Sequence, residues 1–259
     1  MDVISVVEFE QLGYADGEAL QQRLVRLRQQ QCIGDVLLLL EHPPVVTLGR
    51  NAHRENLLLS GEQLHGLGVE VAECNRGGDV TYHGPGQLVG YPIVDLRACS
   101  RPPWMPPSTS RLRGLGPVDY VRGLEEVLIR TAAQFGLPCR RMAGLTGVWT
   151  QAEPARKLAA IGVHVARGVT SHGFALNVAP DLGGFGYIVP CGIRDHGVTS
   201  LEQELGRSPG MDEVRSVVLR QFGSVFGRQI LRPDSAEPLL QHEAGLAAQV
   251  SAAGDFVGR

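Results

Sequence analysis

The sequence RGGDVTYHGPGQ, residues 76–87, is the most informative stretch of the chain. Its four glycines and one proline fix a backbone that can approach a ligand closely. Polar side chains are added to this backbone by Arg76, Thr81, Tyr82, His83 and Gln87. The simpler interpretation is a glycine-rich hairpin between Cys74 and Leu88. A P-loop is excluded, because the pattern G-x-x-x-x-G-K-[ST] is absent.

On both sides of this stretch, short β-runs alternate with single helices. The strands expected from apolar patterning are 3–9, 36–41, 45–48, 69–74, 88–96, 148–151, 158–165 and 169–178. The expected helices are 16–31, 118–135 and 211–226, with Asp16 and Ser208 as N-caps and Gly136 after the second helix. Strands in hairpin-like clusters with single helices favour an α+β fold, with mixed, largely antiparallel sheets and flanking helices.

One domain is expected over residues 1–232. Residues 101–117 (RPPWMPPSTSRLRGLGP) form a proline-rich insertion that predicts a mobile surface loop. Residues 233–259 form a tail with weak amphipathic character, for which a short helix and disorder are both open interpretations.

Composition narrows the class of protein. The chain has 259 residues, 43% of them hydrophobic, and no apolar run approaching the ~20 residues of a membrane span. With no secretory signal in view, we expect a cytoplasmic protein that does not enter a membrane. A net charge of −3 gives no reason to expect nucleic acid as a partner. Neither the five scattered cysteines nor the histidines have metal-site spacing, so no metal is expected.

Lysine usage is unusual, because Lys157 is the one lysine among 24 Lys and Arg residues. The bland interpretation is that it survived an arginine-rich composition by chance. The sharper one is that this position needs an ammonium group that can lose its proton, which a guanidinium does not do.

Further motifs follow the glycine-rich stretch in order: GVWT at 147–150, RKLAAIGVHV at 156–165, SHGFALNV at 171–178, IVPCGI at 188–193 and VTSL at 198–201. Together they resemble the lipoyl(octanoyl) transferases, the lipoate biosynthesis protein B family, over roughly residues 5–230. The resemblance implies the fold of biotin and lipoate protein ligases and no cofactor. It also implies transfer of octanoyl from octanoyl-acyl carrier protein to a lysine of lipoyl domains. The acceptors would be 2-oxoacid dehydrogenases and the glycine cleavage H protein.

By the same resemblance, Cys191 is the nucleophile that accepts the acyl group and Lys157 is its partner. Substrate contacts are implied for Arg76, Gly77, Gly78, Asp79, Val80, Thr81, Tyr82, His83, Ala160, Ile161, Gly162, Gly173, Phe174 and Ala175. The chemistry agrees, since a nearby cation favours the thiolate and a neutral lysine can accept a proton from the attacking amine. Without the motif, Cys191 would more simply be a buried turn cysteine.

Other residues have weaker assignments. For His83 and His172, a direct part in catalysis and a hydrogen-bonding role that supports the glycine turns are equally consistent with the sequence. His164 could point either into the pocket or into solvent. An alkyl channel is expected to be lined by Leu158, Ile161, Phe174, Leu176 and Val189, although most of these would equally serve as core. Acidic partner domains would be steered by Arg111, Arg113, Arg140, Arg141 and Arg167, or these arginines are simply solvated.

Three alternatives remain open. An ATP-dependent lipoate or biotin ligase would need a pocket for adenylate phosphate and no nucleophilic cysteine. A non-catalytic binder of lipoyl domains would tolerate substitution of Cys191. A thioesterase would resolve the acyl-enzyme with water.

Overall fold

Eight strands form the central sheet of the molecule. The computed structural model describes residues 2–102, 104–105, 114–190 and 196–232. In spatial order the strands are β11 (Arg228–Leu231), β1 (Asp2–Glu8), β2 (Asp35–Leu40), β6 (Gln87–Ile93), β10 (Val169–Asn177), β9 (Lys157–Ala166), β8 (Leu145–Thr150) and β7 (Cys139–Met142). β1 runs parallel to β2 and β11, and the other neighbouring pairs are antiparallel. The predicted mixed, largely antiparallel α+β fold is confirmed.

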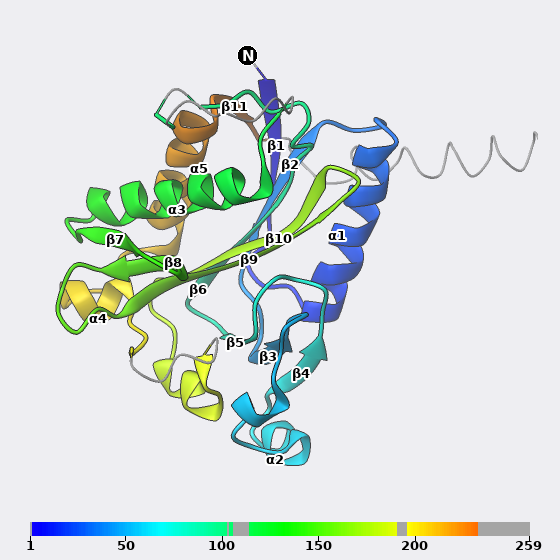
Figure 1. The fold of residues 1–259 in the computed structure, drawn as a ribbon. Helices are drawn as coiled ribbons and strands as arrows, with labels where there is room; N and C mark the ends of the chain where they lie inside the picture. The colour runs from blue at the N-terminus through cyan, green and yellow to red at the C-terminus, as the bar shows by residue number, and fades with distance from the viewer. Residues whose placement is uncertain (1, 103, 106–113, 191–195, 233–259) are drawn as a thin grey trace, which may run out of the picture.

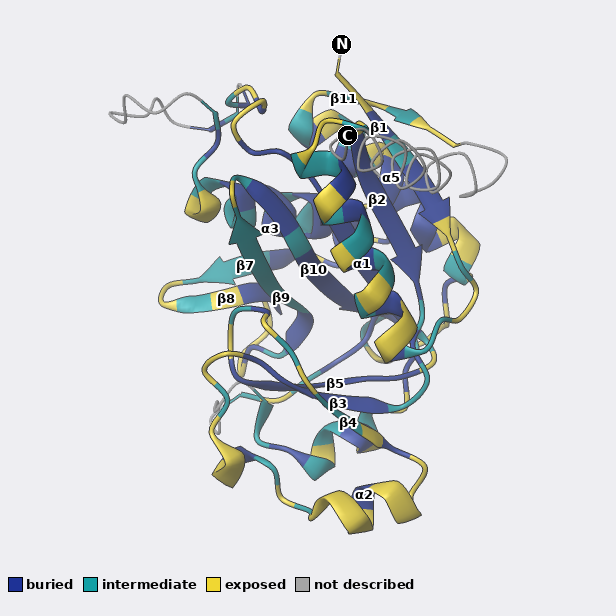
Figure 2. Ribbon diagram, turned by 90° about the vertical axis from the view of Figure 1, so that its right-hand side faces the viewer, coloured by how far each residue is buried: buried dark blue, intermediate teal, exposed yellow. Residues whose placement is uncertain are grey.

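Helices cover both faces of this sheet. α3 (Pro117–Gln134) and α5 (Met211–Phe226) lie on one face and α1 (Tyr14–Gln29) on the other (Figure 1). The strand β2 is apolar at nearly every position because its residues contribute to two separate cores. Leu37 and Leu39 join the core under α3 and α5, while Val36, Leu38 and Leu40 join the core under α1. Both faces of β2 are therefore buried, as its unbroken dark colour shows in Figure 2.

A second, three-stranded sheet lies at one end of the first (Figure 1). It consists of β4 (Glu70–Glu73), β3 (Val45–Leu48) and β5 (Val80–His83), with α2 (Gly61–Gly66), η1 (Arg54–Asn56) and η2 (Leu182–Tyr187) nearby. β5 pairs with β3, whereas β6 pairs with β2 and β10. The interpretation of residues 76–87 as a simple hairpin is therefore wrong, because the turn before Gln87 carries the chain from one sheet to the other.

The helix ends correct two predicted caps. α1 begins at Tyr14, with Gly13 as N-cap, because the Tyr14 side chain is buried in the core; Asp16 lies inside the first turn. α5 begins at Met211 as predicted, but its N-cap is Gly210. Ser208 is therefore too far upstream to cap it. Gly136 follows α3 with φ of 83°, which confirms the predicted left-handed end.

The described part of the insertion packs on the core. Trp104 donates a hydrogen bond from Nε1 to the Val225 carbonyl at 3.0 Å, and Met105 and Leu115 are buried. The prediction of a surface loop is wrong for these residues, since their apolar side chains find room beside α5. Residues 103 and 106–113, and the tail 233–259, lie outside the described residues. Within the described part of the chain, no helix is long and apolar enough to cross a membrane.

Candidate active site

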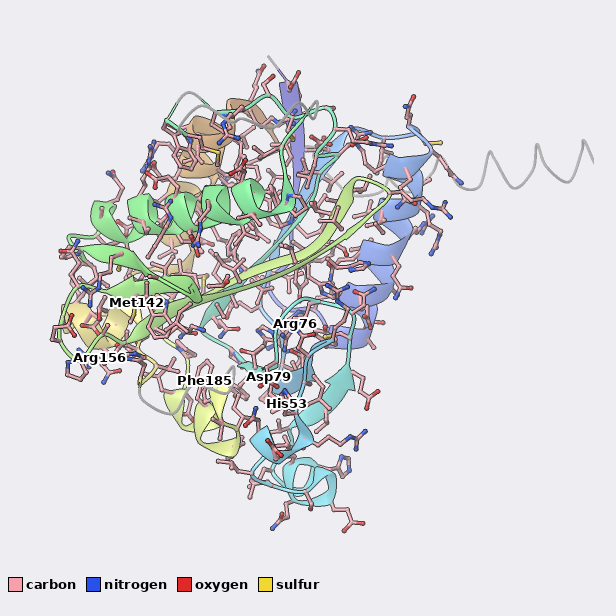
Figure 3. The ribbon with its side chains drawn as sticks, in the orientation of Figure 1. His53, Arg76, Asp79, Met142, Arg156 and Phe185 are labelled. Atoms are coloured by element: carbon pink, nitrogen blue, oxygen red, sulfur yellow. The ribbon has the colours of Figure 1, made fainter. Side chains whose placement is uncertain are left out.

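A cavity of about 730 Å³ opens where the two sheets meet. Its walls come from the segment after β3, the glycine-rich loop, α3, the turn before β8, and β9. The lining residues are Asn51, His53, Glu55, Asn56, Gly77, Gly78, Asp79, Val121, Gly144, Leu145, Thr146, Lys157, Ile161, Gly162 and Val163. The labelled side chains of Arg76, Asp79 and His53 gather at this junction in Figure 3.

Asp79 holds one wall of this cavity together. Its Oδ1 accepts the His53 backbone N–H at 2.9 Å, and its Oδ2 accepts from Asn56 Nδ2 at 2.5 Å. The carboxylate thus ties the glycine-rich loop to η1 and the residue before it. Charge-assisted hydrogen bonds of this kind are stronger than neutral ones, so the wall is preorganised.

Arg76 is the buried cation of the loop. Its guanidinium donates to the Thr47 carbonyl at 2.7 Å and to Thr47 Oγ1 at 2.9 and 3.1 Å, and also to the Gly77 carbonyl. Thr47 lies in the middle of β3, so Arg76 fixes the loop against the small sheet. The side chain is buried, and its charge therefore acts on neighbouring groups with little screening by water.

Two glycines allow this loop to lie directly on β9. The Gly77 N–H donates to the Val163 carbonyl at 3.1 Å. A Cβ at Gly162 would lie only 2.6 Å from the Gly77 carbonyl oxygen. Any side chain at position 162 would therefore push the loop away from the strand.

A smaller cavity of about 50 Å³ adjoins the large one through shared lining residues. It is lined by Tyr14, Arg76, Gly77, Gly78, Thr81, His83, Val89, Tyr91, Ala160, Ile161, Gly162, His172, Gly173, Phe174 and Ala175. Eleven of the fourteen predicted substrate contacts are among them, and Asp79 lines the large cavity. Val80 and Tyr82 belong instead to the core of the small sheet, because alternate residues of β5 point to opposite faces.

A hydrogen-bond chain fixes the His83 ring. Gln87 Nε2 donates to the Tyr82 carbonyl at 3.3 Å and to Asn177 Oδ1 at 2.8 Å, and Asn177 Nδ2 donates to the Thr199 carbonyl. Carbonyls only accept, so Gln87 Oε1 must accept the proton of His83 Nδ1, 2.6 Å away. The Nε2 atom of His83 is therefore the unprotonated nitrogen of a neutral ring.

Burial keeps both cavity histidines neutral. Loss of solvent, reinforced by the nearby His42, lowers the pKa of His83 to about 3. Burial and then the Arg76 charge lower the pKa of His172 to about 4. Neither ring is positively charged near neutral pH, so neither supplies a cation to the site.

Lys157 lies on the wall of the large cavity at the start of β9. The residue is 6% exposed, and its Nζ lies 4.9 Å from the centroid of the Trp149 ring, a favourable cation–π distance. Its backbone N–H donates to the Gly197 carbonyl at 2.8 Å, and its carbonyl accepts from Thr199. The lysine is thus held by both β8 and the segment that precedes α4 (Leu201–Leu205).

Cys191 lies outside the described residues, which stop at Pro190 and resume at His196. The described residues on either side of this gap contact the large cavity's walls. The Val189 N–H donates to the Asn56 carbonyl at 2.8 Å, and Gly197 bonds to Lys157. Among the described cysteines, burial raises the pKa of Cys139 to about 12 and also raises that of Cys99, so both are unreactive thiols.

Part of the expected alkyl channel lies in the core instead of lining a cavity. Leu158 and Leu176 are fully buried in the core beside α3, so only Ile161 and Phe174 of the expected channel line the small cavity. Arg140 pairs with Glu153, and Arg141 pairs with Glu125 and Glu126. Each of these two arginines has a carboxylate partner within the chain, and their steering of acidic domains stays a prediction; Arg111 and Arg113 lie outside the described residues.

Some cavity residues have no signal in the sequence. Asn51 and Asn56 follow β3, Thr146 is the second residue of β8, and Tyr14 and Tyr91 come from α1 and β6. His164 lines a third cavity rather than the first two. Among the described residues, no group of three His, Cys, Asp or Glu side chains is placed to hold a metal ion.

Comparison with known proteins identifies the family. The model of the lipoyl protein ligase A/B catalytic domain matches residues 13–223. The chain belongs to this family. It is 54% identical over 249 residues to the octanoyltransferase of Acidobacterium capsulatum, covering 94% of this chain and 98% of that one. It is 50% identical to the octanoyltransferase of Koribacter versatilis, covering 95% and 94%.

Solved lipoate protein ligases share the fold. A lipoate-protein ligase A bound with ATP superposes with a TM-score of 0.65 at 15% identity, covering 93% of both chains. A bi-partite archaeal lipoate protein ligase from Thermoplasma acidophilum gives a TM-score of 0.62 at 15% identity, covering 93% of this chain and 91% of that one. The predicted biotin/lipoate ligase-like fold is confirmed by these likenesses.

Proposed function

We propose that this protein is an octanoyltransferase, which moves an octanoyl group from octanoyl-acyl carrier protein to a lysine of lipoyl domains. The main support is the pair of relatives at 54% and 50% identity, each named octanoyltransferase and each matched over nearly its whole length. The site's chemistry agrees, since the chain's one lysine lies on the wall of the large cavity.

In the proposed first step, the Cys191 thiolate attacks the carbonyl carbon of the carrier thioester. A new carbon–sulfur bond forms, the bond to the carrier sulfur breaks, and the carrier thiolate takes up a proton from Lys157, which becomes neutral. The acyl group stays a thioester throughout, so its activation is kept without ATP. The positive charge of Lys157 favours the thiolate before the attack.

In the proposed second step, the amine of the acceptor lysine attacks the acyl-enzyme. An amide bond forms, Cys191 leaves as a thiolate, and Lys157, once neutral, accepts the proton from the amine. The acceptors we propose are the lipoyl domains of 2-oxoacid dehydrogenases and the glycine cleavage H protein.

The acyl tail is proposed to run from the large cavity into the small one. Ile161 lines both cavities and Phe174 lines the small one, so the end of the chain leaves water against apolar side chains. Each buried methylene contributes about 0.8 kcal/mol, which favours octanoyl over acetyl. We propose Arg76–Asp79, Thr81 and His83 as the polar frame of this channel.

The test is intact-mass spectrometry of the enzyme mixed with octanoyl-acyl carrier protein, without nucleotide. We expect one hydroxylamine-sensitive octanoyl adduct, lost in Cys191→Ser and retained in the control Cys139→Ser, which changes a buried thiol of β7. Adding an apo-lipoyl domain should discharge the adduct onto that domain. An absolute need for ATP would favour the ligase alternative. Release of free octanoate with no acylated acceptor would favour the thioesterase.

A further inference from the structure

Three cavities border β9, the first two over overlapping stretches of the strand and the third farther along it. The large cavity is lined by Lys157 and by Ile161–Val163, and the small one by Ala160–Gly162. A third cavity of about 230 Å³ follows at the far end of the strand, where His164 and Ala166 line it beneath α1. The small cavity has lining residues in common with each of the other two, whereas no described residue lines both the large and the third cavity.

The connections between these cavities differ. The large and small cavities share Gly77, Gly78, Ile161 and Gly162, so the first passage is framed mainly by glycines. The small and third cavities share one lining residue, His172. His172 thus borders both spaces, and we refer to it as the partition between the small and third cavities.

The His172 side chain is held firmly in this position. Nε2 lies 2.7 Å from Asn75 Oδ1, and the ring meets the Tyr91 ring edge-on with centroids 6.2 Å apart. The backbone N–H donates to Gln21 Oε1 at 2.7 Å. The residue has φ of 55°, a left-handed conformation that is uncommon outside glycine, asparagine and aspartate, although histidine is also enriched there. Asn75 and Tyr91 thus hold the His172 ring, and Gln21 holds its backbone.

We propose that His172 limits the length of the acyl chain that the enzyme accepts. The inference rests on the proposed function, because it assumes that the tail enters the small cavity from the large one. A chain that fills the small cavity ends against the His172 ring and cannot reach the third cavity. Val25 and Ala166 give that third cavity apolar surface, so a longer tail would find contacts there once the partition is removed.

The experiment measures kcat/KM for octanoyl- and tetradecanoyl-acyl carrier protein with wild type and His172→Gly. Glycine suits the left-handed backbone and removes the side chain. We expect the tetradecanoyl-to-octanoyl ratio to rise by about tenfold or more, the size of effect that a hydrophobic pocket can give. His172→Asn, which also tolerates this backbone and is shorter, should raise the ratio by less and serves if the glycine variant does not fold.

Two controls separate the partition from general loosening. His164→Ala enlarges the third cavity without touching the small one, so the ratio should stay at the wild-type value. Adding Ala166→Leu to His172→Gly refills the space behind the opened partition and should return the ratio to the wild-type value. If His172→Gly and His172→Asn fold and transfer octanoyl with an unchanged ratio, the inference is overturned.

Failure of the proposed function would give a different result. If wild type transfers no acyl group, chain-length preference is measured by binding, as the thermal stabilisation given by octanoate and by tetradecanoate. If tetradecanoate then stabilises His172→Gly more than it stabilises wild type, and Ala166→Leu reverses this gain, the role of His172 as a limit on chain length is supported although the transferase assignment has failed. No gain would overturn the partition as well.

Discussion

Replacing Gly162 with alanine places one methyl group at the junction of the two sheets. The new Cβ would lie 2.6 Å from the Gly77 carbonyl oxygen and 3.3 Å from Arg76 Cδ. To reach ordinary contact at 3.4 Å, strand and loop would have to separate by about 0.8 Å. The closest obstacle is backbone, which cannot rotate aside as a flexible side chain can.

Overpacking of this kind costs about 1–3 kcal/mol of unfolding free energy. For a domain of this size, each kcal/mol lowers Tm by roughly 2–4 °C, so we expect a decrease of about 2–12 °C. Gly162 also lines both cavities, so kcat/KM for octanoyl transfer should fall by about tenfold or more.

The assays are thermal unfolding followed by circular dichroism and octanoyl transfer to an apo-lipoyl domain. Gly34→Ala is the matched control, because a Cβ there meets no atom within 4 Å and its φ lies outside the left-handed region. Gly34→Ala should keep or slightly raise Tm, through the lower entropy of the unfolded chain. If Gly162→Ala matches Gly34→Ala in both assays, the close packing of loop on strand does not constrain the site.

Three further predictions concern charged groups. Lys157→Arg keeps the positive charge but cannot act as a base, so in single-turnover experiments it should form the acyl-enzyme and transfer the acyl group to the acceptor slowly. Lys157→Met should slow both steps. Equal rates in wild type and both variants would show that Lys157 takes no part in the reaction. His83 and His172 have folded pKa values of about 3 and 4, below the ordinary 6.5, so the unfolded chain binds more protons below pH 6.5. The unfolding free energy should therefore fall as pH falls from 6.5 towards 4, by at most roughly 1.4 kcal/mol per pH unit for each histidine, and His172→Asn should flatten this slope in chemical denaturation. Glu125→Gln should lower the unfolding free energy by about 1.5–3 kcal/mol, because the fully buried carboxylate accepts hydrogen bonds from the Gly147 N–H and from Arg141. Glu153→Gln, on the exposed surface, should lower it by under about 1 kcal/mol. Equal losses of unfolding free energy would show that the Glu125 charge is not needed.

Local patterns predicted the long elements well. The apolar periodicity of 118–135 and 211–226 and the apolar run at 36–41 correspond to α3, α5 and β2 within one or two residues. The missed elements are short or depend on distant partners. β11 has four residues and exists through parallel pairing with β1, more than 200 residues earlier in the chain. One local signal was overlooked, since Ser60 and Gln63 form the capping box that starts α2.

The site was predictable only as far as its motifs extend. The residues of the glycine-rich stretch and of β9 and β10 meet at the small cavity, because their segments are neighbours in the fold. The walls supplied by Tyr14, Tyr91 and Asn56 come from elements whose place beside the motifs depends on the packing of the whole domain. Val80 and Tyr82 show that a residue of a motif can point into the core and away from the cavity when it lies in a strand.

The position of β11 has a consequence for synthesis of the chain on the ribosome. β1 is made first, yet one of its two edges is paired by Arg228–Leu231. Arg228 also reaches Asp2 and Asp35, at 3.1 Å each. The nascent chain must therefore carry an open β1 edge until more than 220 further residues have been added. Open edges pair readily with other chains, so the interval before β11 emerges is when this protein most needs protection from aggregation.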